Sequence, residues 1–141
     1  MSKSFSAKLD ELYSMLEYID HVARQAQFGE LDLGKIQVAC EEVLVNVIDH
    51  AYKGKSGVIE IECIECDPKG IKIRIVDQGV SFNPLQYKEV DVAAPLEERE
   101  IGGLGLLIAR HFMDDIDYER KAKNNILTMK KFLEDAPIRA Q

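Results

Sequence analysis

Three short stretches of this sequence carry residue types that suit phosphate and metal chemistry. In the first, Glu42 and Asn46 stand four positions apart in a helical pattern, and Asp49 follows about one turn later on nearly the same side. A carboxylate there can orient or deprotonate a hydroxyl, and an amide oxygen can bind a hard cation such as Mg²⁺. The spacing alone leaves open the alternative of a polar stripe that simply faces solvent.

The second stretch closes a predicted strand with an aspartate and a glycine. Asp77 shares the alternation of Ile73 and Ile75, so its carboxylate is predicted on the buried face, where it needs a partner. The exocyclic amine of adenine is one candidate, and a turn or capping role is the alternative. Gly79 supplies either a positive φ or room for a flat ring against the backbone.

The third stretch is a glycine cluster, Gly102, Gly103 and Gly105, that precedes and opens a helix together with Leu104. Unpaired amides and the helix dipole favour phosphate at such a position, although glycines also allow close packing of the backbone. The cluster is neither a dinucleotide-binding fingerprint nor a P-loop. Taken together, the three stretches predict a nucleotide pocket.

Helices and strands of the right kind surround these stretches. Apolar residues at spacings of three and four predict an amphipathic helix from Leu9 to Ala26, ended by Gly29. Asp32 is predicted to cap a second helix, which carries the first polar stretch. A third helix is predicted over 104–113, after the glycine cluster.

Alternation of apolar and polar residues predicts two strand pairs. Ile59 to Cys63 and Ile71 to Ile75 form the first pair, joined by type I turn chemistry over 67–70. Ile116 to Arg120 and Ile126 to Phe132 form the second pair, with a polar turn between them.

The segment of about 80–102 fits neither the helical nor the strand period. A long segment of this kind inside a compact domain is usually functional or mobile. Its place between two glycine motifs favours a lid, and a disordered surface insertion is the alternative.

Composition limits the class of protein. The chain of 141 residues, with 30% charged and 46% apolar residues and no linker, is predicted to form one domain over 1–141. Its net charge of −7 argues against direct nucleic-acid binding. The apolar runs are too short to span a membrane and the start has no secretory signal, so a cytoplasmic location is expected. Cys63 and Cys66 are predicted to face opposite sides of a strand, as filler thiols.

The order of the three motifs resembles a known ATP-binding fold. Glu42-x-x-x-Asn46, Asp77-x-Gly79 and Gly103-x-Gly105 resemble the motifs shared by gyrase, the heat-shock chaperone of that class, histidine kinases and mismatch-repair ATPases. The detail is closer to the RsbW-like anti-sigma factor serine/threonine kinases. Residues 41–52 are similar to their helix motif, 77–84 to their first glycine box, and 95–106 to their lid and second box. The similarity runs from about residue 5 to residue 133.

The resemblance implies a fold and a cofactor. The fold is a Bergerat-type α+β domain, a two-layer α/β sandwich with a mixed, mostly antiparallel sheet and helices on one face. ATP or ADP would lie beneath the flexible lid. The resemblance assigns nucleotide-binding roles to a set of residues that includes all three motifs: Asn46, Asp49, Asp77, Gly79, Gly102, Gly103, Leu104 and Gly105.

Specific roles also follow from the resemblance. Glu42 would be the general base for a protein serine or threonine hydroxyl, Asn46 would hold Mg²⁺, and Asp77 would read the adenine amine. The family often has a threonine near the start of the last strand that helps to bind adenine. In this chain Asn125 and Ile126 stand there and Thr128 follows, so the adenine contact from this strand stays open.

The resemblance implies an ATP-dependent protein serine/threonine kinase. Such a protein sequesters a sigma factor and phosphorylates a small STAS-type anti-sigma antagonist, and it can form a homodimer. The histidine-kinase branch would add a phospho-acceptor helix pair, for which this chain has no room. The alternative is a module that uses ATP only to switch its affinity for partners, with little or no phosphotransfer. Glu42 favours the kinase, because a pure binder needs no base beside the magnesium ligand.

Overall fold

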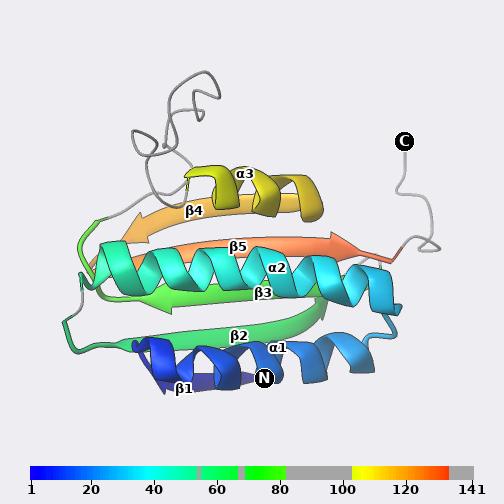
Figure 1. Ribbon diagram of the computed structural model, residues 1–141, viewed down its shortest axis with the longest axis horizontal. Helices are drawn as coiled ribbons and strands as arrows, with labels where there is room; N and C mark the ends of the chain where they lie inside the picture. The colour runs from blue at the N-terminus through cyan, green and yellow to red at the C-terminus, as the bar shows by residue number, and fades with distance from the viewer. Residues whose placement is uncertain (54, 67–68, 82–102, 134–141) are drawn as a thin grey trace.

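The protein is a two-layer sandwich in which one antiparallel sheet is covered by helices on a single face (Figure 1). The computed structural model describes residues 1–53, 55–66, 69–81 and 103–133, with the backbone alone for 103–107. Its elements follow in chain order: β1 (Ser2–Ser6), a 3₁₀ turn (Leu9–Glu11), α1 (Leu12–Gln25), α2 (Glu30–Asn46), a π-helical turn (Val47–Ala51), β2 (Val58–Cys66), β3 (Gly70–Asp77), α3 (Gly103–Phe112), β4 (Asp115–Lys121) and β5 (Asn124–Phe132).

The predicted fold class is confirmed. The sheet has the strand order β1-β2-β3-β5-β4. Each pair of neighbours in the described part is antiparallel, so the sheet that the resemblance suggested to be mixed has no parallel pair there. For β1 and β2 the reason lies in the connection between them. α1 and α2 run in opposite directions, so β2 starts at the end of the sheet where β1 finished (Figure 1).

The edge strand β1 was missed by the sequence analysis. Its five residues are mostly serine, and only Phe5 is buried, so the stretch shows no alternation of apolar residues. Phe5 stands opposite Ile59 of β2 in the register. One buried side chain and the backbone pairing with β2 hold this strand, and neither signal is visible in the local sequence.

The helix starts also differ from the predicted ones. Residues Leu9–Glu11 form a 3₁₀ turn, and α1 begins after it. Gly29, in extended conformation, is the N-cap of α2, and the amide of Leu33 donates to its carbonyl oxygen at 2.9 Å. The prediction that Asp32 caps this helix is therefore wrong. Asp32 lies in the first turn, where its negative charge interacts favourably with the positive end of the helix dipole.

The core lies between the sheet and the helices. Inward-facing isoleucines of β2 and β3 pack with apolar side chains of α1 and α2. The largest members of this core have less than 2% exposure: Met15, Ile19, Ile36, Leu44, Ile59, Ile61, Ile71, Ile73, Ile75 and Met129.

Cys40 and Cys63 belong to this packing. Cys63 is buried, and Cys66, three residues later on β2, is half-buried. Burial raises the pKa of Cys63 to about 12, so the thiol stays protonated and unreactive near neutral pH. No group of three or more metal-binding side chains occurs in the described residues. No helix among them is long and apolar enough to cross a membrane.

Two isoleucines on neighbouring strands test which face of the sheet holds the core. Ile73 has no exposed surface, whereas Ile64 is 36% exposed. We expect Ile73→Ala to lower the free energy of unfolding by about 2–5 kcal/mol, because it leaves a cavity in packed core. Ile64→Ala is the matched control and should cost less than about 1 kcal/mol. Urea unfolding measures both, and equal losses would contradict the assignment of the two faces.

Candidate nucleotide-binding site

The predicted site residues gather at one edge of the sandwich. The end of α2, the end of β3, and the starts of α3 and β5 meet there, at the left of Figure 1. A small cavity opens at this edge. It is lined by side chains from α2, from the turn that follows it, and from β3, β4 and β5: Val43, Asn46, Val47, Asp77, Tyr118, Asn125 and Leu127.

Asp77 is the buried acid of this cavity, as its alternation predicted. It is 3% exposed, and it stands directly opposite Asn125 in the register of β3 and β5. One carboxylate oxygen, Oδ1, accepts hydrogen bonds from the amide of Gly79 at 2.8 Å and from Asn125 Nδ2 at 2.9 Å. Within the described part of the chain, the other oxygen, Oδ2, accepts none. The turn role that the sequence left open is therefore real, but it uses only half of the carboxylate.

Opposing effects set the charge of this acid. Burial raises the pKa of Asp77, because a charged carboxylate loses hydration there. The hydrogen bond from Asn125, the amide of Gly79 and the positive charge of Arg120 lower the pKa and oppose the effect of burial. The effect of burial is the larger one, so the pKa of Asp77 lies above its ordinary value. The donors at Gly79 and Asn125 require Oδ1 to act as an acceptor.

Asn125 and its two neighbours on β4 are site residues that sequence reasoning did not assign. Asn125 Oδ1 accepts hydrogen bonds from the Tyr118 hydroxyl and from Arg120 Nη1, the latter at 3.0 Å. Asn125 Nδ2 donates to the carbonyl oxygen of Val80 at 2.8 Å as well as to Asp77. The available signal was the parity of Asn125 with the buried Leu127, which places a polar side chain inside the sandwich.

The register also shows which of the three residues considered on the last strand lies near Asp77. Ile126 pairs with Val76 and Thr128 pairs with Arg74, so both point to the face of the sheet that the helices leave open. Only Asn125 lies beside Asp77. The residue of β5 that contacts the buried acid is thus an asparagine.

Gly79 is required because the backbone of Ala51 lies too close to it for a side chain, and not because of an unusual backbone angle. Its φ does not lie in the left-handed region between +20° and +160°, so that expected role is not found. A Cβ at this position would lie 2.4 Å from the carbonyl oxygen of Ala51, which accepts a hydrogen bond from the amide of Val80 at 2.8 Å. Tyr52 ties the same region together, since its hydroxyl accepts from the amide of Gln78 at 2.9 Å.

Asn46 is a third buried polar residue of the cavity, beside Asp77 and Asn125. It is 4% exposed, and its Nδ2 donates to the backbone carbonyl of Glu42 at 2.7 Å. This bond directs the amide nitrogen back along the helix, and no hydrogen bond reaches Asn46 Oδ1 in the described residues. A hard cation prefers an oxygen ligand of this kind, so Asn46 fits the predicted magnesium role.

The remaining predicted residues of the helix motif lie around Asn46. Glu42 is half-buried, one turn earlier on α2. Asp49 is exposed and does not line the cavity. It belongs to the π-helical turn, whose wider hydrogen-bonding pattern rotates the face on which following residues lie. The single polar line expected through all three residues therefore bends after Asn46.

The glycine cluster is described in part. Gly103, Leu104 and Gly105 form the first turn of α3, as predicted, and this turn lies at the same edge as Asp77 (Figure 1). Gly102 and most of the predicted lid, residues 82–101, lie outside the described residues.

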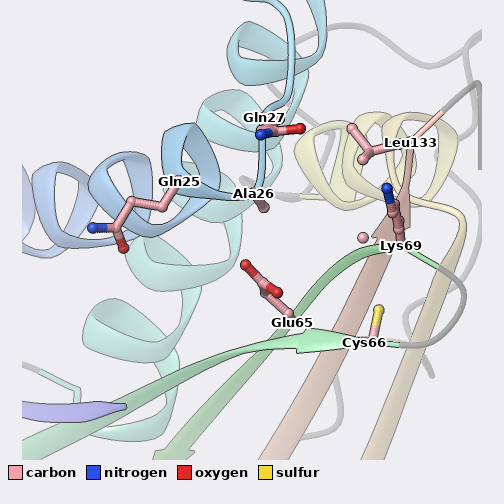
Figure 2. Close-up of a pocket in the computed structure, with 8 residues that line it drawn as sticks. Gln25, Ala26, Gln27, Glu65, Cys66, Lys69 and Leu133 are labelled. Carbon is pink, nitrogen blue, oxygen red and sulfur yellow. The ribbon is translucent and has the colours of Figure 1, made fainter.

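A larger hollow, of about 470 Å³, lies at the opposite end of the sheet. Figure 2 shows side chains from the end of α1, from β2 and from Lys69 around it. It contains none of the predicted site residues, and Gln25, Gln27 and Glu65 on its rim are exposed. Because β3 begins beside this hollow and ends at Asp77, the hollow is distinct from the cavity that Asp77 lines.

The sequence profile of the histidine kinase-like ATPase domain matches residues 5–131. The chain therefore belongs to this family, in which the domain binds a nucleotide. The likeness to RsbW-type proteins is confirmed by curated relatives. The serine/threonine-protein kinase BtrW of Bordetella bronchiseptica is 25% identical over 130 residues, 92% of this chain and 88% of the relative.

Two further relatives agree. The serine-protein kinase RsbW of Listeria monocytogenes is 32% identical over 100 residues, 67% of this chain and 63% of the relative. The anti-sigma F factor of Caldanaerobacter subterraneus is 28% identical over 103 residues, 72% of this chain and 71% of the relative.

Solved structures confirm the fold. The RsbU and RsbW domains of a Mycobacterium tuberculosis protein align with a TM-score of 0.61 at 12% identity, covering 94% of this chain and 32% of that one. The histidine kinase domain of a blue-light activated kinase from Erythrobacter litoralis aligns with a TM-score of 0.54 at 16% identity, covering 86% and 59%.

Two glycines in different surroundings test whether the Ala51 carbonyl leaves room for a side chain at position 79. We expect Gly79→Ala to lower the free energy of unfolding by roughly 1–3 kcal/mol, because its Cβ would overlap the Ala51 carbonyl. Gly34→Ala, inside α2 with nothing within 4 Å of the added Cβ, should instead stabilise by about 0.5–1 kcal/mol. Chemical denaturation compares them, and a neutral Gly79→Ala would refute the steric argument.

Proposed function

We propose that this protein is an ATP-dependent protein serine/threonine kinase of the RsbW type, acting as an anti-sigma factor in partner switching. The observation that carries the proposal is the buried Asp77 carboxylate, which keeps one oxygen for a ligand in a cavity shared with Asn46. Its partners would be a sigma factor and a small STAS-type antagonist that carries the phosphorylated hydroxyl. The names of the relatives support this role.

In this proposal the nucleotide spans the edge of the sandwich. Asp77 Oδ2 accepts a hydrogen bond from the adenine amine, and the backbone at Gly79 lies beside the ring. The phosphates lie toward the first turn of α3, where the amides of a helix start have no partners within the helix. A chain with a net charge of −7 repels an anion overall, so these amides must supply the local attraction.

Asn46 would hold Mg²⁺ through Oδ1, which its own bond to the Glu42 carbonyl leaves facing away from the helix backbone. When bound, the cation would neutralise phosphate charge. Asp49, exposed in the next turn, would contact the nucleotide only from the rim of the site.

Glu42 would act as the general base. Its side chain is half-buried one helical turn before the magnesium ligand. As the hydroxyl oxygen of the antagonist forms its bond to the γ-phosphorus and the bond to ADP breaks, the Glu42 carboxylate would accept the hydroxyl proton.

The Glu42 assignment is tested by a change that removes basicity but keeps size. Glu42→Gln should leave ATP affinity within a few-fold and slow phosphotransfer to the antagonist by about 10²–10⁴-fold. Asn46→Ala should damage both, because magnesium orients the phosphates before the chemistry. Calorimetry and a labelled-ATP transfer assay measure the two effects. Equal transfer by wild type and Glu42→Gln would exclude Glu42 as the base, and no transfer by wild type would favour the switch module.

The Asp77 assignment is tested by comparing a ligand that contains adenine with one that contains phosphates alone. Asp77→Asn places an amide, which both donates and accepts, where an acceptor faces the adenine amine. We expect ADP affinity to fall by about 10–100-fold, whereas the affinity for inorganic triphosphate stays within a few-fold. Calorimetry with the two ligands measures the difference. A parallel loss of both would place Asp77 away from the base.

A further inference from the structure

We propose that Asn125, held in place by Tyr118 and Arg120, restricts Asp77 to one acceptor oxygen and thereby selects adenine over guanine nucleotides. The inference rests on the proposed function, because it concerns the base of the nucleotide that Asp77 binds. It assigns a specificity role to three residues on the β4–β5 hairpin, which lies far in the sequence from the three motifs.

Asn125 uses its full hydrogen-bonding capacity inside the protein. Its two N–H groups donate to Asp77 Oδ1 and to the Val80 carbonyl, and its oxygen accepts from Tyr118 and from Arg120. An amide side chain has two donors and two acceptor positions, so all four are occupied. Asn125 therefore acts on the base through Asp77, as a positioning residue, and not by direct contact.

Tyr118 and Arg120 determine which way the Asn125 amide points. Both present donors on one side of it, and Asp77 and Val80 present acceptors on the other. A reversed amide would place an oxygen against the Asp77 carboxylate and an NH₂ group against the Arg120 guanidinium, and both contacts would repel. Arg120 Nη1 also donates to the Gly79 carbonyl at 2.9 Å, which ties the hairpin to the end of β3.

The consequence for Asp77 is that its two oxygens are not equivalent. Oδ1 is filled by the Gly79 amide and by Asn125, whereas Oδ2 accepts no hydrogen bond from the described residues. A carboxylate with both oxygens open matches two parallel donors, such as the N1–H and N2–H of guanine. Adenine offers one amine beside an acceptor nitrogen, so a single open oxygen suits adenine and leaves one guanine donor unpaired.

The test compares two β-branched replacements of nearly equal shape. Asn125→Thr keeps a hydroxyl that can donate to Asp77. Asn125→Val has no donor, so Oδ1 keeps only the Gly79 amide and gains a free acceptor position for a second donor of the base. The ratio of the dissociation constants for GDP and ADP, measured by calorimetry, should fall about tenfold in Asn125→Val. In Asn125→Thr it should stay within about threefold of wild type.

Two further variants separate this role from a structural one. Thr128→Val makes the same change of hydroxyl to methyl on β5, but on the opposite face of the sheet, and should leave the ratio unchanged. Tyr118→Phe removes one donor that orients the amide and should lower the ratio by about two- to fivefold. Tyr118→Phe keeps the test available if Asn125→Val does not fold, as judged by circular dichroism.

The outcomes distinguish this inference from the proposed function. Nucleotide binding by wild type with an unchanged ratio in Asn125→Val overturns the selection by Asn125 and leaves the kinase proposal standing. If Asn125→Val does not fold, an unchanged ratio in Tyr118→Phe has the same meaning. An equal fall of the ratio in Asn125→Thr and Asn125→Val overturns it too, because the loss would then follow from shape. Absence of both ADP and GDP binding in wild type overturns the proposed function, and the inference with it.

Discussion

The burial of one carboxylate at the end of β3 is the constraint on which the site depends. A buried charge without partners is unfavourable by several kcal/mol or more, so Asp77 requires donors from the surrounding elements. The protein supplies the Gly79 and Asn125 amides, which both donate to Oδ1, and the positive field of Arg120. The side that remains is the one that a ligand can satisfy. Stability and recognition thus share one group.

The antiparallel pairing of β3 with β5 makes this arrangement possible. It places Asn125 directly opposite Asp77, and the pairing of β5 with β4 places Arg120 opposite Asn125. A slip of one residue would bring Ile126 beside Asp77 and turn the Asn125 amide toward the open face of the sheet. The isoleucines that alternate along β3 fix the inward face, so core packing also fixes the polar network.

Local patterns predicted those parts of the site that depend on one element. Asp77 was assigned to the buried face from its parity with the isoleucines of β3, and Asn46 from its place in a helical motif. The network around Asn125 was not predicted, because it depends on which strand lies beside β3, and alternation does not reveal a neighbour. The role of Gly79 was missed for a similar reason. Its partner, the Ala51 carbonyl, belongs to a π-helical turn that has no simple sequence signature.

β5 holds both the buried acid Asp77 and the helix α3 in place. At its start, Asn125 donates to Asp77, the acid that is proposed to bind the base, and near its end the buried Lys131 donates from Nζ to the Phe112 carbonyl at 2.7 Å. That bond satisfies a carbonyl that lacks a partner within the helix. It also places a positive charge at the C-terminal end of α3, where the charge interacts favourably with the negative end of the helix dipole. The C-terminal end of α3 is thereby fixed on the sheet, and its glycine-rich first turn lies at the other end, where the proposed function places the phosphates. Because both anchors project from the same face of one strand, β5 fixes the position of α3 relative to Asp77. In the proposed function, the length of α3 then sets how far the glycine-rich turn lies from the acid.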